Sequence, residues 1–325
     1  MKNSYLKFGI FFLGLFACTA SLPSCNSADK SSDDKAAKED SLKMKVEKGR
    51  YLAYHVSGCI DCHSQRDYKK FSGLIVPGSE GKGGEVFNEI YAIPGVVFAK
   101  NITADTVNGI GKWTDEEIAR AITRGISRNG DTLFPIMPYP HYNQMSKDDI
   151  YSIIAFLRTL KPNDNKVTER KLFVPLSTVY PPLPSSLLEY NIKPDVSDMV
   201  KYGAYVANSA ACMDCHTPMD KGKYQMDKLF SGGFVFNMGS FKVTSANITP
   251  DTATGIGKWT EEMFLDKFKH YRDPSLYTSD PGKTNSIMPW SLFAKMEDFD
   301  IKAIYRYLRT VPAVNHHVDK YPPEK

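Results

Sequence analysis

The sequence predicts an all-α protein made of two similar halves. Three observations lead to this fold class. Residues 46–161 and 198–312 are two copies of one unit, and a repeat of this length indicates tandem domains rather than a solenoid. Near the end of each copy, apolar residues follow helical spacing. No segment of the chain shows a convincing alternating strand pattern.

The clearest predicted helix closes each repeat. Apolar residues recur there at i, i+3, i+4 and i+7, as Ile150, Ile153, Ile154 and Leu157 in the first copy and Ile301, Ile304, Tyr305 and Leu308 in the second. Ser146 is a suitable N-cap for the first of these helices. Another helix should begin at Thr114 or Thr260, where Thr114 and Glu117 form a capping-box pattern. A first helix, over 43–57 or 198–210, precedes each cysteine pair.

The expected organisation has six parts. They are a signal peptide at 1–25, a flexible tether at 26–42, a first domain at 43–161, a linker at 162–197, a second domain at 198–315 and a tail at 316–325. The tether is rich in Ser, Asp, Lys and Ala and has little to bury. The linker contains Pro175, Pro181, Pro182, Pro184 and Pro194, so we expect it to be stiff and extended.

The N-terminus has the pattern of a secretory signal. Lys2 and Lys7 precede the apolar run 8–17, which is shorter than the roughly 20 residues that a membrane-spanning helix needs. Leu22-Pro23-Ser24-Cys25 resembles a lipobox, so Cys25 is the predicted lipidated residue. Cys18 and an ordinary signal without a lipid are the alternatives.

Each repeat carries the pentapeptide Cys-x-x-Cys-His. Cys59, Cys62 and His63 correspond to Cys212, Cys215 and His216. Two thiols one helical turn apart can each form a thioether with a haem vinyl group, and the adjacent histidine then reaches the iron. A redox disulfide or half of a zinc site would use a similar cysteine pair, but two full motifs at equivalent positions favour two covalently bound haem c groups.

Methionines are the candidates for the second axial position. Met137 and Met288 are equivalent, and each is followed by proline. A thioether suits the iron of an electron carrier. Met145 and Met296 form a competing pair that we expect to face the core. The histidines His55, His141 and His270 do not repeat, so we interpret them as core or surface residues.

Two further pairs recur beside the motifs. Trp113 and Trp259 either pack in the core or donate an indole N–H to a haem propionate. Asn101 and Asn247 either contact the propionates or hold a turn.

With these residues, the chain resembles the multihaem cytochrome c subunits of bacterial alcohol, gluconate and related dehydrogenases. The resemblance rests on Asn-Ile-Thr, Gly-Ile-Gly-Lys-Trp-Thr, Met-Pro and a final Leu-Arg-Thr helix, each present in both repeats. It implies class I cytochrome c domains with His/Met iron. It also implies that electrons pass from a dehydrogenase toward the respiratory chain, with a terminal oxidase or another cytochrome as acceptor. Those subunits commonly have three haem domains and a C-terminal anchor, whereas this chain has two domains and a predicted N-terminal lipid.

Charge and ligand pattern narrow the function further. The 41 Lys+Arg against 37 Asp+Glu form no basic stripe, which argues against a nucleic-acid partner. Both repeats keep Met-Pro, so both irons should be closed to substrate. This favours an electron carrier, exported and lipid-anchored on the periplasmic side of a membrane. The alternative is a dihaem enzyme, a peroxidase or a sulfur-compound oxidoreductase, with one catalytic haem.

Overall fold

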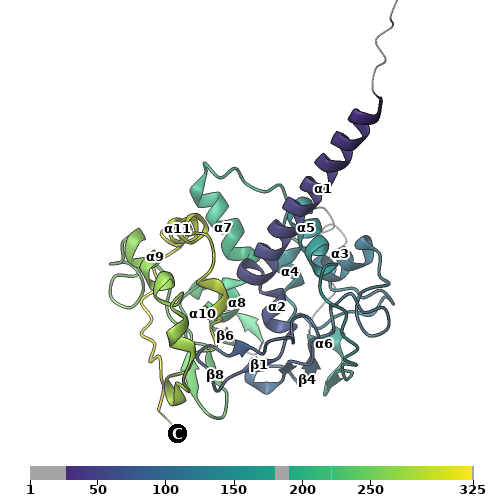
Figure 1. The fold of residues 1–325 in the computed structure, drawn as a ribbon. Helices are drawn as coiled ribbons and strands as arrows, with labels where there is room; N and C mark the ends of the chain where they lie inside the picture. Colours follow the sequence, from purple (N-terminus) through teal and green to yellow (C-terminus); the bar gives the residue numbers. More distant parts are fainter. Residues whose placement is uncertain (1–26, 180–189, 221, 324–325) are drawn as a thin grey trace, which may run out of the picture. The chain divides into compact units, whose positions relative to one another are not determined.

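The computed structural model describes residues 27–179, 190–220 and 222–323 (Figure 1). The predicted signal peptide, Cys18 and Cys25 lie outside these residues. The chain divides into two units, residues 1–41 and the body formed by residues 42–325. No helix in the described part of the chain combines the length and the apolar character needed to span a bilayer.

The segment expected to be a flexible tether is helical. Helix α1 (Ser27–Tyr51) begins within it, and side chains 34–42 are exposed. Alanine, glutamate and lysine favour a helix, although this stretch has no apolar stripe to bury. The composition therefore predicted the exposure of the segment but not its backbone conformation.

The body contains the end of α1 and ten further helices among its described residues. They are α2 (Cys59–Cys62), α3 (Asp115–Arg124), α4 (Tyr139–Tyr142), α5 (Lys147–Leu157), α6 (Leu176–Val179), α7 (Met199–Ser209), α8 (Cys212–His216), α9 (Glu261–His270), α10 (Trp290–Phe293) and α11 (Asp298–Leu308). A π-helical segment, η1 (Leu52–Val56), continues α1. Short 3₁₀ turns are η2 (Glu89–Tyr91), η4 (Met226–Lys228), η5 (Pro274–Tyr277) and η6 (Gly282–Thr284).

Local capping explains where the longer helices begin. Thr114 and Glu117 form both bonds of the predicted capping box at the start of α3. The Ser146 hydroxyl accepts the Asp149 N–H at the start of α5. In the second repeat, Thr260 caps α9 in the same way through the Met263 N–H. These predicted helix starts are confirmed.

The prediction of an all-α fold needs correction, because the body is helix-rich with small antiparallel sheets. The paired strands are β1 (Arg66–Asp67) with β2 (Leu74–Ile75), β3 (Val86–Phe87) with β4 (Gly95–Phe98) and β4 with β5 (Lys171–Leu172) in the first half. In the second half β6 (Met219–Asp220) pairs with β7 (Lys223–Tyr224) and β8 (Val235–Asn237) with β9 (Lys242–Thr244). Strands of two to four residues are too short to show an alternating pattern.

The π-helical segment absorbs a one-residue difference between the repeats. Ten positions separate Gly49 from Cys59, whereas nine separate Gly203 from Cys212. In the first repeat the extra residue lies where η1 interrupts the regular α-helix. A single π-turn inserts one residue into a helix, so both cysteine motifs follow equivalent glycines despite the insertion.

These two glycines let the first helix of each repeat cross its last helix closely. A Cβ on Gly49 would lie 1.7 Å from the carbonyl oxygen of Ser152 in α5. A Cβ on Gly203 would lie 1.9 Å from the carbonyl oxygen of Ala303 in α11. Any larger residue at either position would force the two helix backbones apart.

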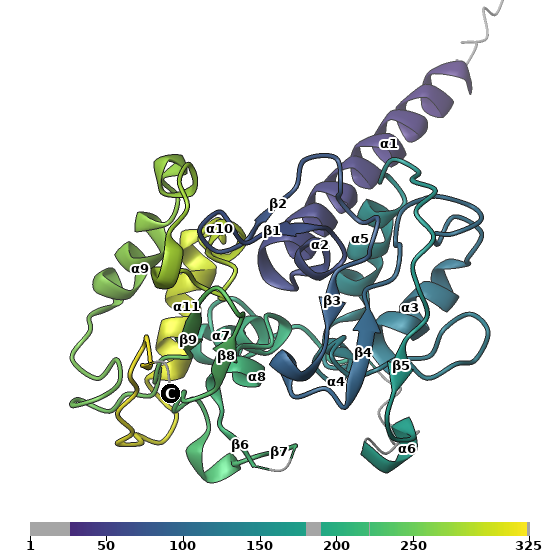
Figure 2. The same ribbon diagram turned by 90° about the horizontal axis from the view of Figure 1, so that it is seen from below.

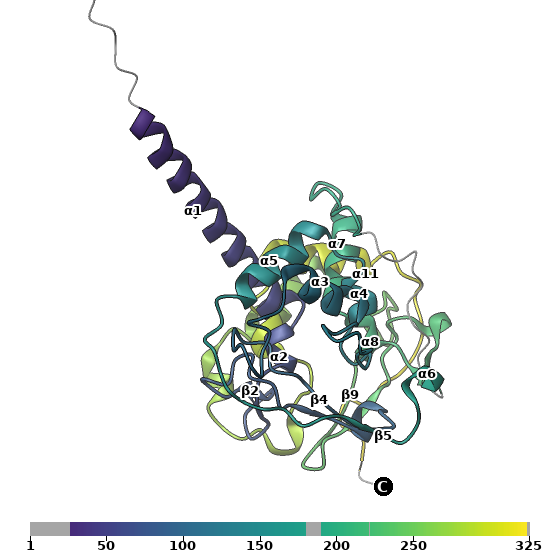
Figure 3. The same cartoon turned by 90° about the vertical axis from the view of Figure 1, so that its right-hand side faces the viewer.

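The two repeats share one core, so the expected tandem domains form a single compact body. One continuous cluster of buried side chains includes Ile153 and Ile154 of the first repeat and Ile301 and Leu308 of the second. Figure 2 shows the first repeat (blue to teal) beside the second (green to yellow). Helices α3, α5, α7 and α11 gather at one end of the body and the strand pairs at the other (Figures 1 and 3).

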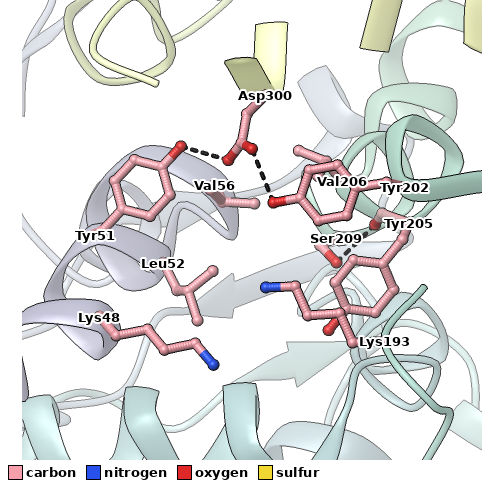
Figure 4. A pocket seen from close by; sticks show the side chains of 10 residues that line it. All are labelled: Lys48, Tyr51, Leu52, Val56, Lys193, Tyr202, Tyr205, Val206, Ser209 and Asp300. Atoms are coloured by element: carbon pink, nitrogen blue, oxygen red, sulfur yellow. Dashed lines mark hydrogen bonds between the residues drawn. The ribbon is translucent and has the colours of Figure 1, made fainter. Parts of the chain in front are cut away.

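Reciprocal hydrogen bonds join the repeats. Tyr51 donates to Asp300 at 2.6 Å, and the equivalent Tyr205 donates to the equivalent Asp149, also at 2.6 Å. Lys48, at the position equivalent to Tyr202, pairs with Asp149 at 2.5 Å, whereas Tyr202 donates to Asp300 at 2.8 Å. All of these side chains except Asp149 line a cavity of about 50 Å³ (Figure 4). The contact is therefore a pseudo-twofold interface with unequal charge on its two sides.

The expected linker and tail begin by packing on their own repeats. Asn165 donates to the Lys82 carbonyl at 2.9 Å, and β5 adds a strand to β4. In the second repeat, the Thr244 N–H donates to the Lys320 carbonyl at 2.9 Å, the counterpart of the β5 pairing. Residues 162–172 and 316–320 thus complete the repeats, and a stiff linker over the whole of 162–197 stays a prediction.

Candidate functional site

Each predicted attachment motif forms a short helix that begins from a left-handed residue. Gly58 precedes α2 with φ of 63°, and Ala211 precedes α8 with φ of 50°. The four cysteines of these motifs are free thiols; Cys215 is exposed and the other three are half-buried. Two free thiols per motif is the arrangement that thioether attachment requires.

The motif histidines are oriented by the backbone in the same way in both repeats. The Nδ1 atom of His63 lies 2.6 Å from the Lys100 carbonyl oxygen, and that of His216 lies 2.7 Å from the Ala246 carbonyl oxygen. A carbonyl accepts only, so each Nδ1–H is the donor and each Nε2 keeps its lone pair. Burial lowers the pKa of both histidines, although the carbonyl bond opposes it. Neutral imidazole with an anchored Nδ1 is the form that binds a metal.

The two methionine pairs lie in different environments. Met137 and Met288 are half-buried, each in a turn where its carbonyl accepts the N–H two residues later at 2.7 Å. Met145 is fully buried and Met296 is 3% exposed. The Ser57 hydroxyl also donates to the Met145 sulfur at 3.8 Å. Met145 and Met296 are therefore core residues, which leaves Met137 and Met288 as the candidate ligands.

The asparagines hold loops rather than presenting free amides. Both amide hydrogens of Asn101 are used, with Nδ2 at 2.8 Å from the Asn163 carbonyl oxygen and 3.1 Å from that of Asn165. Asn247 donates to the Val314 carbonyl at 2.8 Å and to Thr254. A propionate would have to displace these bonds, so the geometry favours the turn interpretation over the predicted propionate contact.

The tryptophans keep both predicted roles open. Trp113 and Trp259 are half-buried and pack against the core. Within the described part of the chain, neither indole N–H has a protein acceptor. Packing is thus observed, and a propionate contact stays a prediction.

Two of the three histidines weighed as rival ligands, His55 and His141, lie at the interface between the repeats. His55 Nδ1 is 3.1 Å from the Leu292 carbonyl oxygen. His141, 9% exposed, contacts Asn208 and Asp214, whereas His270 is exposed. The sequence had indicated only a core or surface role for these residues. Lack of repetition alone does not indicate an interface position, because His270 has no counterpart either and is exposed.

The residues fit covalent haem better than zinc. A structural zinc site usually takes four cysteine or histidine ligands, whereas each motif supplies two cysteines and one histidine. Across residues 27–179, 190–220 and 222–323, no three His, Cys, Asp or Glu side chains converge to hold a metal. One histidine, two thiols and a half-buried methionine per repeat match a haem c donor set.

Sequence comparison decides the class of the second repeat. Residues 200–312 match the family described as "Cytochrome c". This part of the chain is a cytochrome c domain. A cytochrome c domain carries covalently bound haem c, and Cys212, Cys215 and His216 lie within the matched residues.

Curated relatives extend the similarity over most of the chain. The cytochrome c subunit of a quinone alcohol dehydrogenase from Gluconobacter oxydans is 27% identical over 289 residues, 85% of this chain and 56% of the relative. The gluconate 2-dehydrogenase cytochrome c subunit of Pantoea cypripedii is 28% identical over 284 residues, 82% and 60% of the two chains. A diheme cytochrome c-type protein of Cereibacter sphaeroides is 26% identical over 275 residues, 80% and 84%.

These relatives support an electron-transfer cytochrome. The chain spans a little more than half the length of the two dehydrogenase subunits, but most of the diheme protein. The similarity covers both repeats, so the first repeat is similar to cytochrome c sequences as well as to the second.

Proposed function

We propose that this chain is a dihaem electron carrier that accepts electrons from a periplasmic dehydrogenase and passes them toward the respiratory chain. The single observation that carries the proposal is the pair of anchored histidines, His63 and His216, each beside two free thiols. Bound haem c would supply a one-electron iron couple. In each repeat the chain would contribute two thioether sulfurs and one imidazole nitrogen.

Met137 and Met288 would supply the second axial ligands. Both lie in the same turn, with the N–H of Tyr139 or Trp290 fixed on the methionine carbonyl at 2.7 Å. Since both repeats keep this turn, neither offers the asymmetry that a catalytic haem with an open position would need. The geometry therefore favours the carrier over the dihaem enzyme.

Methionine substitutions in the haem-loaded protein test this proposal. Met137→Ala and Met288→Ala should each remove about half of the far-red sulfur-to-iron band of the oxidised protein, because each takes a ligand from one iron. Met145→Leu is the matched control, since that residue is buried in the core, and it should leave the band intact. High-spin iron in the unmodified protein, or fewer than two covalent haems by mass, would contradict the proposal.

Cys25 is the proposed site of the lipid that holds the protein at a membrane. The proposal rests on the sequence Leu22-Pro23-Ser24-Cys25 after an apolar run. In cells supplied with a labelled fatty acid, Cys25→Ala should lose the label and leave the membrane fraction, whereas Cys18→Ala should keep both. The reverse pattern would assign the lipid to Cys18, and label on neither protein would remove the anchor from the proposal.

A further inference from the structure

An acidic residue lies between the two cysteines of each attachment motif, and the two repeats neutralise it differently. Asp61 pairs with Arg66 of its own repeat at 2.5 Å, and the Arg66 side chain is 5% exposed. Asp214, the equivalent residue, accepts a hydrogen bond from His141 of the other repeat at 2.8 Å. It also accepts one from Tyr224 at 3.0 Å. The first motif is thus completed within its repeat and the second is not.

His141 carries a positive charge in this arrangement. Its Nε2 faces the Asp214 carboxylate, and its Nδ1 lies 2.8 Å from Oδ1 of Asn208. The Nδ2 atom of Asn208 donates to the His141 carbonyl at 3.0 Å. Exchanging the oxygen and nitrogen of this side-chain amide would remove that hydrogen bond, so Oδ1 is the atom that faces the His141 ring. Both ring nitrogens therefore face acceptors, which requires the doubly protonated imidazolium. Burial lowers the pKa of His141, but the bonds to Asp214 and Asn208 raise it further, so the net shift is upward.

His141 also belongs to the loop that carries the first candidate methionine ligand. Helix α4 follows Met137 and Pro138 directly, and the His141 N–H donates to the Pro138 carbonyl at 3.0 Å. On its other side, Asp214 lies inside α8, between the two cysteines of the second motif. One side chain therefore links the distal loop of the first site to the attachment helix of the second.

The second repeat makes no equivalent contact, from the position that corresponds to His141, with Asp61 of the first motif. Leu292 occupies the position equivalent to His141, and its side chain has no polar atom to bond Asp61. Its contact with the first repeat is through its carbonyl oxygen, which lies 3.1 Å from His55 Nδ1. Asp61 already has Arg66. The connection consequently runs in one direction, from the first repeat to the second attachment helix.

We propose that His141 is a positioning residue for the second haem site, holding Asp214 and α8 so that the reduction potential of this site depends on the first repeat. The proposal rests on the function proposed above. The imidazolium offsets the charge of the Asp214 carboxylate, which lies between the two cysteines that would hold the haem. A net negative charge at this position would favour oxidised iron. Loss of His141 should therefore lower the potential of the second site alone.

Redox titration of the haem-loaded full chain tests the proposal, with the second-site step identified as the one altered by Met288→Ala. His141→Leu should shift the oxidised-to-reduced ratio of that step by up to about tenfold, equal to about 59 mV for one electron. His141→Gln keeps a donor without the charge and should shift the same step less. His55→Leu removes the pseudo-symmetric interface bond and should move neither step.

A double-mutant cycle with Asp214→Asn keeps the test decisive if His141→Leu does not fold. His141→Gln should have less effect in that background, because its partner is neutral. An unmoved second step, an equal shift of both steps or additive effects in the cycle would overturn the proposal. Haem mass and the sulfur-to-iron band, measured on the same samples, separate this outcome from failure of the proposed function, which would remove those signals from the unmodified protein.

Discussion

Gly203→Ala is expected to separate the two helices that support the second repeat. The new Cβ would lie 1.9 Å from the Ala303 carbonyl oxygen and 3.1 Å from the Ile304 N. Real Cβ contacts lie at 3.0 Å or more, so α11 must retreat by more than about 1 Å. The obstacle is backbone, which cannot rotate away as a side chain would. The retreat would loosen Ile301 and Leu308, which are 0% and 1% exposed.

The expected cost lies at the upper end for overpacked cores, about 3 kcal/mol. With an m value of roughly 4 kcal/mol per M in guanidinium chloride, the unfolding midpoint should fall by about 0.7 M. Far-UV circular dichroism of the haem-loaded protein measures this shift. Gly239→Ala is the matched control, because its φ is +80° and nothing lies within 4 Å of the new Cβ. It should cost only the left-handed strain, about 1 to 2 kcal/mol. A Gly203→Ala protein no less stable than this control would refute the close-crossing argument.

Three further predictions concern other parts of the body. Burial raises the pKa of Asp149, but its bonds to Lys48 and Tyr205 lower it more, so the net pKa lies below 3.8. The stability it contributes is full above pH 3.8 and is lost as pH falls through the folded pKa. Unfolding midpoints of wild type and Asp149→Asn should therefore converge as the pH falls below 3.8, and a pH-independent gap would contradict this origin. Ala211→Gly should raise stability by about 0.5 to 1 kcal/mol, because glycine tolerates the left-handed backbone there; thermal unfolding tests this, and a lower Tm would count against the reasoning. Asn247→Ala should cost about 2 kcal/mol through loss of its loop bonds without moving either redox step, whereas a shifted second step would restore the propionate interpretation.

Local signals predicted the chemistry and the longer helices. The helix starts could be predicted from Thr114 with Glu117 and from Ser146, because a capping side chain bonds to backbone groups in the first turn of the same helix. The two Cys-x-x-Cys-His motifs could be found because haem attachment needs neighbouring side chains only. The expectation that Met145 faces the core rested on its place just before the last helix, and it agrees with the full burial of this side chain.

Features that depend on distant segments could not be predicted in this way. Nothing in the sequence around Asn101 indicates that Asn163, some 60 residues later, would take its amide hydrogens. The pairing of β5 with β4 could not be predicted either, because a strand of two residues is too short to show an alternating pattern. The partnership of His141 with Asp214 depends on how the repeats face each other. Their arrangement as one body, rather than as two domains on a linker, likewise follows from surfaces that lie far apart in the chain.

The joining of both copies in one chain changes what a near-symmetric interface can become. In a dimer of identical chains every substitution at the contact occurs twice, so the two sides stay alike. Here Lys48 faces one buried carboxylate where Tyr202 faces the other, and a single change alters one side only. Because both copies lie in one chain, the two repeats can differ at an otherwise symmetric interface. Such a difference is needed if electrons are to enter through one repeat and leave through the other.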